Sequence, residues 1–462
     1  MNIISTEQVK KAVYQLCLRA NTQLPKSVYS KILKAYYEAD ENSEIKEILK
    51  CIIQNAKIAY DTKKPLCQDT GQVIVFVEVG QNVMLQGDLL ENAINDGVKE
   101  SYIHNYFRKS VVANAVFDRS NTKTNTPAII YSKFVEGDEI KISVLVKGGG
   151  SENKSRLEML LPTLNEDEIV QKCAQMIVEA GKNACPPMFV GIGIGGTADS
   201  AAVASKKVFV GENSDENELR LAKKIKQAVN KIAPESFNGM YLLDVKVKSL
   251  PTHIACMPVA VTINCHSDRT STCILKNNEI IFTDEPVEYI EISEEKAEKR
   301  EIFADDVQTV KALKQGENVL LTGEIYVARD MAHKKLTEML ENGEELPFDF
   351  KDKMIFYAGP CPNKPDEVIG SVGPTTASRM DKYAVLFYDK GLLATIAKGD
   401  RSKEVLDCIK RNGAKYFSVV GGIAALLAEK VKKSEIIAFE ELGAEAVYKL
   451  YVEKLPVKVE IA

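Results

Sequence analysis

The ten cysteines are the residues of this sequence best suited to bind a metal. They lie at positions 17, 51, 67, 173, 185, 256, 265, 273, 361 and 408, without the close spacings of a disulfide framework. No CxxC pair marks a metal site, and an unpaired cysteine is most often a small buried apolar residue. A metal site therefore has to be recognised from the residues around individual cysteines.

Two polar, glycine-containing segments next to predicted strands have side chains or backbone groups suited to chemistry. CQDTG (67–71) places a thiol, an amide, a carboxylate and a hydroxyl in consecutive positions before a strand. A tight turn, in which Asp69 and Thr70 bond to the backbone, explains these residues equally well. KGGGSEN (147–153) ends another strand with three glycines, whose N–H groups would form either an anion-binding nest or a flexible loop.

A GxGxxG pattern lies between a predicted strand and a predicted helix. MFVGIGIGGTADS (188–200) contains Gly191, Gly193 and Gly196 in this spacing. A dinucleotide site also needs an acidic residue about twenty positions on, at the end of the next strand. Glu212 and Asp215 have that spacing, but they lie in the polar stretch GENSDENE with no strand before them. The sequence therefore disfavours a dinucleotide site.

Cations gather at the ends of predicted elements in the last third of the chain. The segments YVARDMAHKK, GPTTASRMDKY and AKGDRS contribute the cations Arg329, Arg379, Lys398 and Arg401, and the second of these segments also carries Thr375. Because arginine binds a carboxylate through two parallel hydrogen bonds, such a collection favours a carboxylate site over scattered surface charge. A further candidate, His253, lies twelve residues before Cys265 across a predicted strand; a lone histidine is more often structural.

The elements that carry these residues indicate two domains. Helical periodicity begins with Ser5 as a predicted N-cap and continues to about residue 60, and a further helix that ends at Gly181 is predicted within 165–184. Strands are predicted at 71–80, 138–150, 257–265 and 279–284, and the segment 188–207 is predicted to form a strand, a glycine turn and a helix. A compact α/β unit then begins with a predicted strand pair near 316–328 and ends with a predicted helix over 423–433.

We expect an α+β domain over 1–285, a charged linker over 286–308, and a small α/β domain over 309–462.

Composition excludes several function classes. Of the 462 residues, 60 are basic and 65 are acidic, which gives a net charge of −5 and favours neither nucleic acid nor an anionic membrane as a partner. The first twenty residues, MNIISTEQVKKAVYQLCLRA, have no continuous apolar stretch of the kind found in signal peptides. No apolar run is long enough to span a bilayer. We expect a cytosolic protein.

Eight motifs in order resemble those of class I fumarate hydratases and their L-tartrate dehydratase relatives. They are CQDTG, NTPA (125–128), KGGGSEN, CPP…GIGIGG, HIACMPVAV…CHSDR, ARDMAH, GPTTASRMD and AKGDR. The resemblance covers roughly residues 60 to 425. It implies that the first domain corresponds to the family's α subunit and the second, a swivelling β/β/α-like substrate-binding domain, to its β subunit.

The resemblance implies a [4Fe–4S] cluster held by three cysteines, with one iron left open. Cys67 matches the cysteine of CQDTG, and Cys185 matches the one before GIGIGG. Cys256, Cys265 and Cys273 lie close together, and we assign Cys265 as the third ligand because Asp268-Arg269 follows it as in the family. An open iron acts as a Lewis acid toward the substrate's hydroxyl and carboxylate.

The remaining roles also follow from the resemblance. Thr375 matches the base, paired with Asp69 of the other domain, because a threonine hydroxyl needs a carboxylate to take up its proton. The residues that match the lining of the substrate site are Gln68, Arg108, Gly149 or Gly150, His253, Arg329, Arg379 and Lys398. Arg119 is an alternative to Arg108, since this part of the motif is loose. These residues imply a site that draws on both domains.

The expected activity is the reversible hydration of fumarate to L-malate, with a small dicarboxylate as the partner. L-tartrate dehydratase and mesaconate hydratase use the same motifs and stay open as alternatives, because a hydroxyl or methyl difference depends on the shape of the site. A dinucleotide-dependent oxidoreductase is the alternative from another class. The family resemblance also implies a homodimer.

Overall fold

The computed structural model describes residues 2–181, 184–211, 214–292 and 299–461. The chain divides into two compact units, Met1–Glu291 and Ile292–Ala462, here called the N-terminal and C-terminal units. The division falls inside the predicted linker of 286–308, of which residues 293–298 lie outside the described part. Before that gap, Tyr289 packs against Tyr29 and Tyr60 of the N-terminal unit, with ring centroids 4.8 and 5.0 Å apart.

The N-terminal unit begins with three helices, as the periodicity predicts. They are α1 (Thr6–Thr22), α2 (Lys26–Glu38) and α3 (Glu44–Thr62). Ser5 caps α1 as expected: its side chain accepts from the Gln8 N–H, and the Gln8 side chain accepts from the Ser5 N–H. The predicted helical start of the chain is confirmed.

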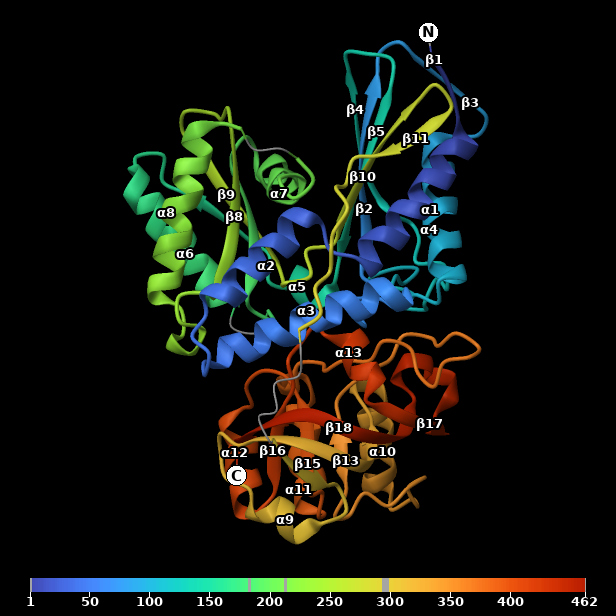
Figure 1. The fold of residues 1–462 in the computed structure, drawn as a ribbon, viewed down its shortest axis with the longest axis vertical. Coiled ribbons are helices and arrows are strands. Elements are labelled where there is room, and N and C mark those ends of the chain that lie inside the picture. The colour runs from blue at the N-terminus through green and yellow to red at the C-terminus, as the bar shows by residue number, and fades with distance from the viewer. Residues whose placement is uncertain (1, 182–183, 212–213, 293–298, 462) are drawn as a thin grey trace. The chain divides into compact units, whose positions relative to one another are not determined.

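The first sheet of the N-terminal unit has five strands in the order β11-β10-β5-β2-β4. The strands are β2 (Gln72–Gly80), β4 (Ile129–Val135), β5 (Ile140–Lys147), β10 (Thr270–Lys276) and β11 (Glu279–Phe282). Helices α1 and α4 (Leu90–His104) pack side by side against it and bury a common apolar core (Figure 1). The short strands β1 (Asn2–Ser5) and β3 (Val83–Gln86) form a separate parallel pair.

The second sheet has four strands in the order β6-β9-β7-β8. They are β6 (Arg156–Leu160), β7 (Met188–Gly195), β8 (Leu242–Leu250) and β9 (Met257–Asn264). Helices α6 (Glu166–Gly181) and α8 (Glu216–Ile232) cover one face, and α7 (Ala198–Lys207) lies on the other (Figure 1).

The glycines of the GxGxxG pattern serve helix packing in this sheet. A Cβ on Gly191 would lie 2.0 Å from the Ser205 carbonyl oxygen, and one on Gly193 would lie 2.1 Å from the Ala201 carbonyl oxygen. Both carbonyls belong to α7, so the glycines let this helix approach β7 more closely than any side chain would permit. This close approach explains the pattern without a bound phosphate.

The C-terminal unit is a mixed α/β domain built on a small closed barrel. Its barrel strands are β13 (Asn318–Val327), β14 (Met354–Phe356), β15 (Ala394–Ala397), β16 (Lys415–Ser418) and β18 (Val447–Ile461). The long strand β18 pairs with both β16 and β13 and so closes the ring. Strands β12 (Arg300–Phe303) and β17 (Val431–Ala438) extend it at β13 and β18.

Helices α9 (Val307–Ala312), α10 (Asp330–Asn342), α11 (Asp381–Asp389), α12 (Lys403–Arg411) and α13 (Ala424–Glu429) complete the C-terminal unit. Two elements of the C-terminal unit differ in the structure from their prediction. The predicted strand pair near 316–328 is the single strand β13, because an irregularity in its pairing with β18 near Gly323 bends it without ending it. The helix predicted over 423–433 ends at Glu429, since Val431 already pairs with Val452 of β18.

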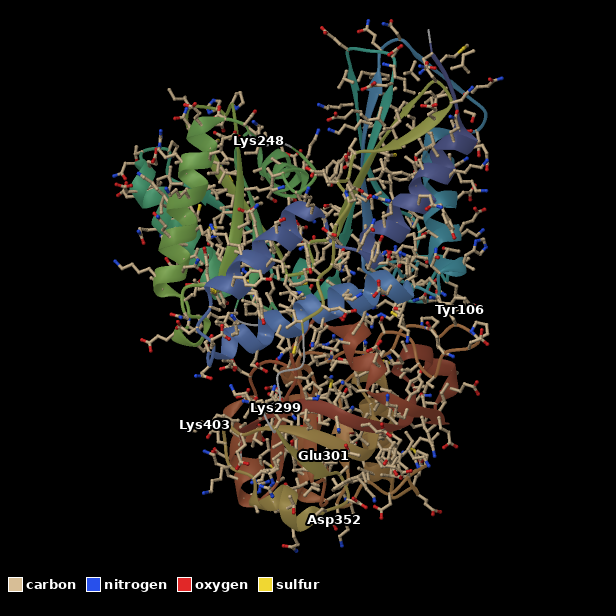
Figure 2. All side chains as sticks on the ribbon, in the orientation of Figure 1. Tyr106, Lys248, Lys299, Glu301, Asp352 and Lys403 are labelled. Atoms are coloured by element: carbon tan, nitrogen blue, oxygen red, sulfur yellow. The ribbon has the colours of Figure 1, made fainter. Side chains whose placement is uncertain are left out.

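Side chains fill the layers between helices and sheets within each unit (Figure 2). None of the helices described has both the length and the apolar character that a membrane crossing demands.

Candidate active site

Strand register brings the loops of three cysteines to the same region of the N-terminal unit. In the first sheet, Gln72 pairs with Lys147 and Leu145 with Thr270, so the start of β2 lies beside the end of β5 and the start of β10. In the second sheet, Phe189 pairs with Asn264, so the start of β7 lies beside the end of β9. The loop from Cys265 to Arg269 joins the two ends.

Cys67, Cys185 and Cys265 all lie in loops at these strand ends. Cys67 precedes β2, Cys185 precedes β7, and Cys265 follows β9. Burial raises the pKa of Cys67 to about 12; Cys265 is close enough to add to this shift, while the Arg269 guanidinium opposes it. Cys67 and Cys265 are therefore close neighbours.

The other two cysteines weighed as ligands are placed differently. Cys256 precedes β9, so the full length of that strand separates it from Cys265. Cys273 is fully buried in the apolar core under α1 and α4, and burial raises the pKa of its thiol to about 12. A thiol in a core of this kind is an inert packing residue.

The donor set fits an iron–sulfur cluster better than a single metal ion. Within the described residues, no group of three or more histidine, cysteine, aspartate or glutamate side chains is arranged to hold one ion. A [4Fe–4S] cluster with one open iron needs three thiolates instead, and thiolates are its usual protein ligands. Cys67, Cys185 and Cys265, each partly accessible at the strand ends, supply such a set.

Asp69 is fixed by four groups, one from its own segment and three from other segments. Its Oδ2 accepts from the Gly149 N–H at 2.8 Å, and its Oδ1 accepts from the Gly71 N–H at 3.2 Å. The Arg108 guanidinium lies 3.3 Å from Oδ1, and Arg269 donates to the Asp69 carbonyl oxygen at 2.7 Å. Burial acts to raise the pKa of Asp69, but the two arginines and the two backbone N–H groups outweigh it and lower that pKa.

The structure brings Arg108 to Asp69 and places Arg119 elsewhere. The chain turns at Tyr106, after α4, with a positive φ of 56° (Tyr106 is labelled in Figure 2). The Arg108 carbonyl then accepts from the Thr70 hydroxyl at 2.6 Å, which ties this segment to CQDTG. Arg119 lies in an exposed loop, where it donates to the Ala115 carbonyl at 2.9 Å.

The KGGG segment lies beside Asp69 at the end of β5. Gly149 opens the short helix α5 (Gly149–Glu152) and donates its N–H to Asp69, while a Cβ on Gly150 would meet no atom within 4 Å. Gln68 is 8% exposed, and its Oε1 accepts from the Cys67 thiol at 3.4 Å. The segment thus leaves open space at Gly150, next to a carboxylate and a cysteine loop.

His253 is not part of this group within one chain. It lies in the loop before β9, at the opposite end of the second sheet from Cys185 and Cys265. Eight strand residues separate the two ends, which corresponds to about 25 Å. The His253 side chain is exposed, and its Nδ1 accepts from the Ala255 N–H at 3.1 Å, so the neutral ring carries its proton on Nε2.

In the C-terminal unit, two carboxylates orient the predicted substrate arginines. Glu445 accepts from Arg329 Nη2 at 2.7 Å through one oxygen and from the Met331 N–H at 2.9 Å through the other. Asp330 accepts from Arg379 Nε at 3.1 Å and from Nη2 at 2.8 Å. The Nη1 of Arg379 donates to the Thr375 hydroxyl at 3.3 Å, so the geometry brings the predicted base and this arginine together.

Backbone pairing places Lys398 beside the Thr375 turn. The Lys398 N–H donates to the Thr375 carbonyl at 3.2 Å, and its own carbonyl accepts from the Ala377 N–H at 2.9 Å. Arg401 is instead buried and structural. It donates to the Ala377 carbonyl at 3.0 Å, to Asp381 at 2.7 Å and to the Thr395 hydroxyl at 2.9 Å.

Sequence reasoning missed Asp330 and Glu445 as partners of the arginines, and Lys147 and Arg269 as buried cations near the cysteines. The motifs ARDMAH, KGGGSEN and CHSDR contain Asp330, Lys147 and Arg269, and this position inside a motif is the feature of the sequence that indicates a role for them. Glu445 follows 116 residues after Arg329 and had no motif to mark it.

Comparison with known proteins identifies the family. The fumarate hydratase (Fumerase) family model matches residues 10–274, and the fumarase C-terminus model matches residues 278–462. The anaerobic class I fumarate hydratase of Escherichia coli is 34% identical over 91% of this chain and 81% of its own length. Fumarate hydratase 2 of Leishmania major is 32% identical over 91% of this chain and 78% of its own length.

A putative L(+)-tartrate dehydratase subunit alpha from Methanocaldococcus jannaschii is 36% identical over 57% of this chain and 95% of its own length. The two family models together span both units, and relatives above 30% identity extend over nine-tenths of the sequence. The chain belongs to the class I fumarate hydratase family.

Proposed function

We propose that this chain catalyses the reversible hydration of fumarate to L-malate with a [4Fe–4S] cluster. The observation that carries the proposal is the position of the Cys67, Cys185 and Cys265 loops at neighbouring strand ends of the N-terminal unit, with Asp69 in the first of these loops. When bound by these cysteines, the cluster supplies a Lewis-acidic iron for the hydroxyl and carboxylate of the substrate. The membership of the class I family supports the same reaction.

The proposed base is Thr375, which takes the proton from the carbon next to the departing hydroxyl. Arg379 donates to its hydroxyl oxygen, and this contact favours the deprotonated form of the threonine. Asp69 is its proposed partner for the proton. Because its pKa is lowered, the carboxylate is ionised at neutral pH and available to accept from a hydroxyl.

The substrate carboxylates are assigned to cations of both units. Arg108, Arg329 and Arg379 are each paired with a carboxylate that orients them, which lowers the entropic cost of orienting the substrate. The residues proposed to bind the substrate are Gln68, Arg108, Gly150, Arg329, Arg379 and Lys398. The closed barrel of the C-terminal unit is compatible with the swivelling β/β/α-like substrate-binding domain that the resemblance implies.

An anaerobic assay of reconstituted protein tests the reaction. Fumarate, L-malate, L-tartrate and mesaconate are compared side by side, and fumarate and L-malate should give the highest kcat/KM. The tartrate dehydratase relative over the N-terminal unit makes tartrate the second candidate. A higher kcat/KM for tartrate or mesaconate would assign the chain to that reaction instead.

We also propose a homodimer in which His253 of one copy serves the site of the other. The length of β9 prevents His253 from touching a four-carbon substrate held beside Cys265 of its own chain. Co-expression of two inactive variants, His253→Ala and Thr375→Ala, tests this. A mixed dimer should regain activity at one of its two sites, whereas no recovery would place His253 outside the reaction. The cytosolic location stays a prediction.

A further inference from the structure

Lys147 is a buried cation that the proposed reaction does not use. It is the last residue of β5 and is 3% exposed. Its ammonium group donates to the Ile263 carbonyl, to Asn264 Oδ1 at 2.8 Å and to the Ser151 hydroxyl at 3.2 Å. All three donors of the ammonium are therefore satisfied, but none of the three acceptors is a carboxylate.

A buried ammonium group without a carboxylate in contact is costly unless negative charge lies nearby. The acceptors of Lys147 point to one source of that charge. Ile263 and Asn264 are the two residues that directly precede Cys265, and Glu152, the Cys265 thiol and Asp268 are all near enough to act on Lys147 electrostatically. An ionised Cys265, on the loop that the Lys147 side chain holds, would add its negative charge to that of the two carboxylates.

The position of Lys147 also joins the two loops of the site. On its own strand it directly precedes Gly148 and Gly149, and the Gly149 N–H binds Asp69. Through its side chain it holds the end of β9, which belongs to the second sheet. At the far end of the same loop, Arg269 donates to the Asp69 carbonyl, so the loop of Cys265 is held by a buried cation at each end.

We propose that Lys147 is a positioning residue for the iron–sulfur cluster, which fixes the Cys265 loop and offsets the negative charge of the thiolates. The inference rests on the cluster named in the proposed function. Lys147 touches neither the substrate nor the reacting atoms in this assignment. Its loss should weaken the retention of the cluster more than it weakens the binding of the substrate.

The test replaces Lys147 with methionine, which keeps the length of the side chain and removes its charge and donors. The variant and the wild-type chain are reconstituted anaerobically, and iron, acid-labile sulfide and absorbance near 400 nm are measured. Release of iron to a chelator is then timed. We expect Lys147→Met to release iron about tenfold to a hundredfold faster than the wild type.

Two further variants control for folding and for the loss of any lysine. Lys207→Met removes a lysine of α7 that pairs with Glu78 at 3.1 Å, and it should release iron at the wild-type rate. Lys147→Arg keeps the charge, but a planar guanidinium cannot direct its N–H groups at the same three acceptors. It should bind a full cluster and release iron faster than the wild type, so the test does not depend on Lys147→Met folding.

The outcomes separate this inference from the proposed function. Iron release at the wild-type rate from Lys147→Arg, or from folded Lys147→Met, overturns the role of Lys147 while the cluster itself stands. A wild-type chain that takes up no iron and sulfide overturns both. Circular dichroism of the cluster-free proteins should be the same for the wild type and for the Lys147→Arg variant; a loss of folded structure in that variant would assign Lys147 to the fold instead.

Discussion

The two units hold their charged site residues in opposite ways. In the N-terminal unit the fixed charge is an anion, Asp69, held by two backbone N–H groups and by arginines. In the C-terminal unit the fixed charges are cations, Arg329 and Arg379, which are paired with side-chain carboxylates of that unit. The Arg379 side chain is 50% exposed, whereas that of Asp69 is 22% exposed.

This difference has a functional consequence. Backbone donors at strand ends cannot rotate away, so the N-terminal group is set before the substrate arrives. Arginines held by carboxylates can exchange one anion for another, which suits the capture and release of a dicarboxylate. We therefore expect substitutions of Asp69 and of the cysteine ligands to act on the cofactor and on kcat, and substitutions that affect Arg329 or Arg379 to act mainly on KM.

The largest expected effect is the loss of the cluster. Cys67→Ser, Cys185→Ser and Cys265→Ser should each lower the iron content and abolish detectable activity, because a cluster with an open iron has only three protein ligands. Cys256→Ser and Cys273→Ser are the matched controls and should keep both the iron content and the activity. Iron and sulfide are measured after anaerobic reconstitution of each variant. A cluster that survives Cys265→Ser and disappears in Cys273→Ser would make the third assignment wrong.

The next effect is on turnover. Asp69→Asn should lower kcat by about 10² to 10⁴-fold while the cluster and KM change little, because a proton acceptor is lost and the shape is kept. Asp118→Asn, in an exposed loop, is the control. The lowered pKa of Asp69 also implies that this group stays ionised down to acid pH. An Asp69→Asn variant with normal kcat and raised KM would remove the contrast between the units.

A smaller effect should appear in KM when Arg329 loses its carboxylate. Glu445→Gln keeps the shape but not the charge, so the guanidinium is less well oriented, and KM should rise about tenfold, or about 1.4 kcal/mol. Glu441→Gln is a matched control on the neighbouring turn, where its carboxylate pairs with Lys335 at the surface. Steady-state kinetics with L-malate separate KM from kcat. Equal effects of both variants would mean that Glu445 has no special role.

Local periodicity predicted the elements that depend on neighbouring residues. The helical start, the helix that ends at Gly181, the strand that leads into the KGGG segment and the strand that begins at Met188 all follow from patterns within about twenty residues. The closed barrel did not follow, because β18 pairs with β13 more than 120 residues away. Pairing at that separation leaves no local pattern in the sequence.

The candidate site likewise contains residues that local motifs predict and contacts that depend on distant parts of the chain. The motifs marked Asp69 and the cysteines, but the contact between Lys147 and Asn264 depends on two sheets meeting at a loop. Arg379 was assigned to the substrate, although Asp330 already occupies two of its donors. The separation of His253 from Cys265 was within reach of the sequence, since a strand of eight residues between them places them at opposite ends of a sheet.

The last expected effect is on stability in acid and not on the reaction. His333 of α10 is buried, and burial lowers its pKa to about 4, although its Nδ1 donates to the Arg329 carbonyl at 3.1 Å. The unfolded chain protonates this histidine near pH 6.5, so the folded state loses stability as pH falls from about 6.5 to about 4. The full loss corresponds to about 3 kcal/mol. Urea unfolding of the whole chain at several pH values measures it.

His333→Phe isolates this term, because phenylalanine fits between Tyr357 and Phe387 and does not titrate. The difference in unfolding free energy between the wild type and His333→Phe should shrink or reverse in favour of phenylalanine between pH 6.5 and pH 4. Asp69 has a lowered pKa instead, so its contribution is lost only as pH falls below about 4. Acid should therefore weaken the C-terminal unit before it releases Asp69, and a pH-independent difference between the two chains would contradict this order.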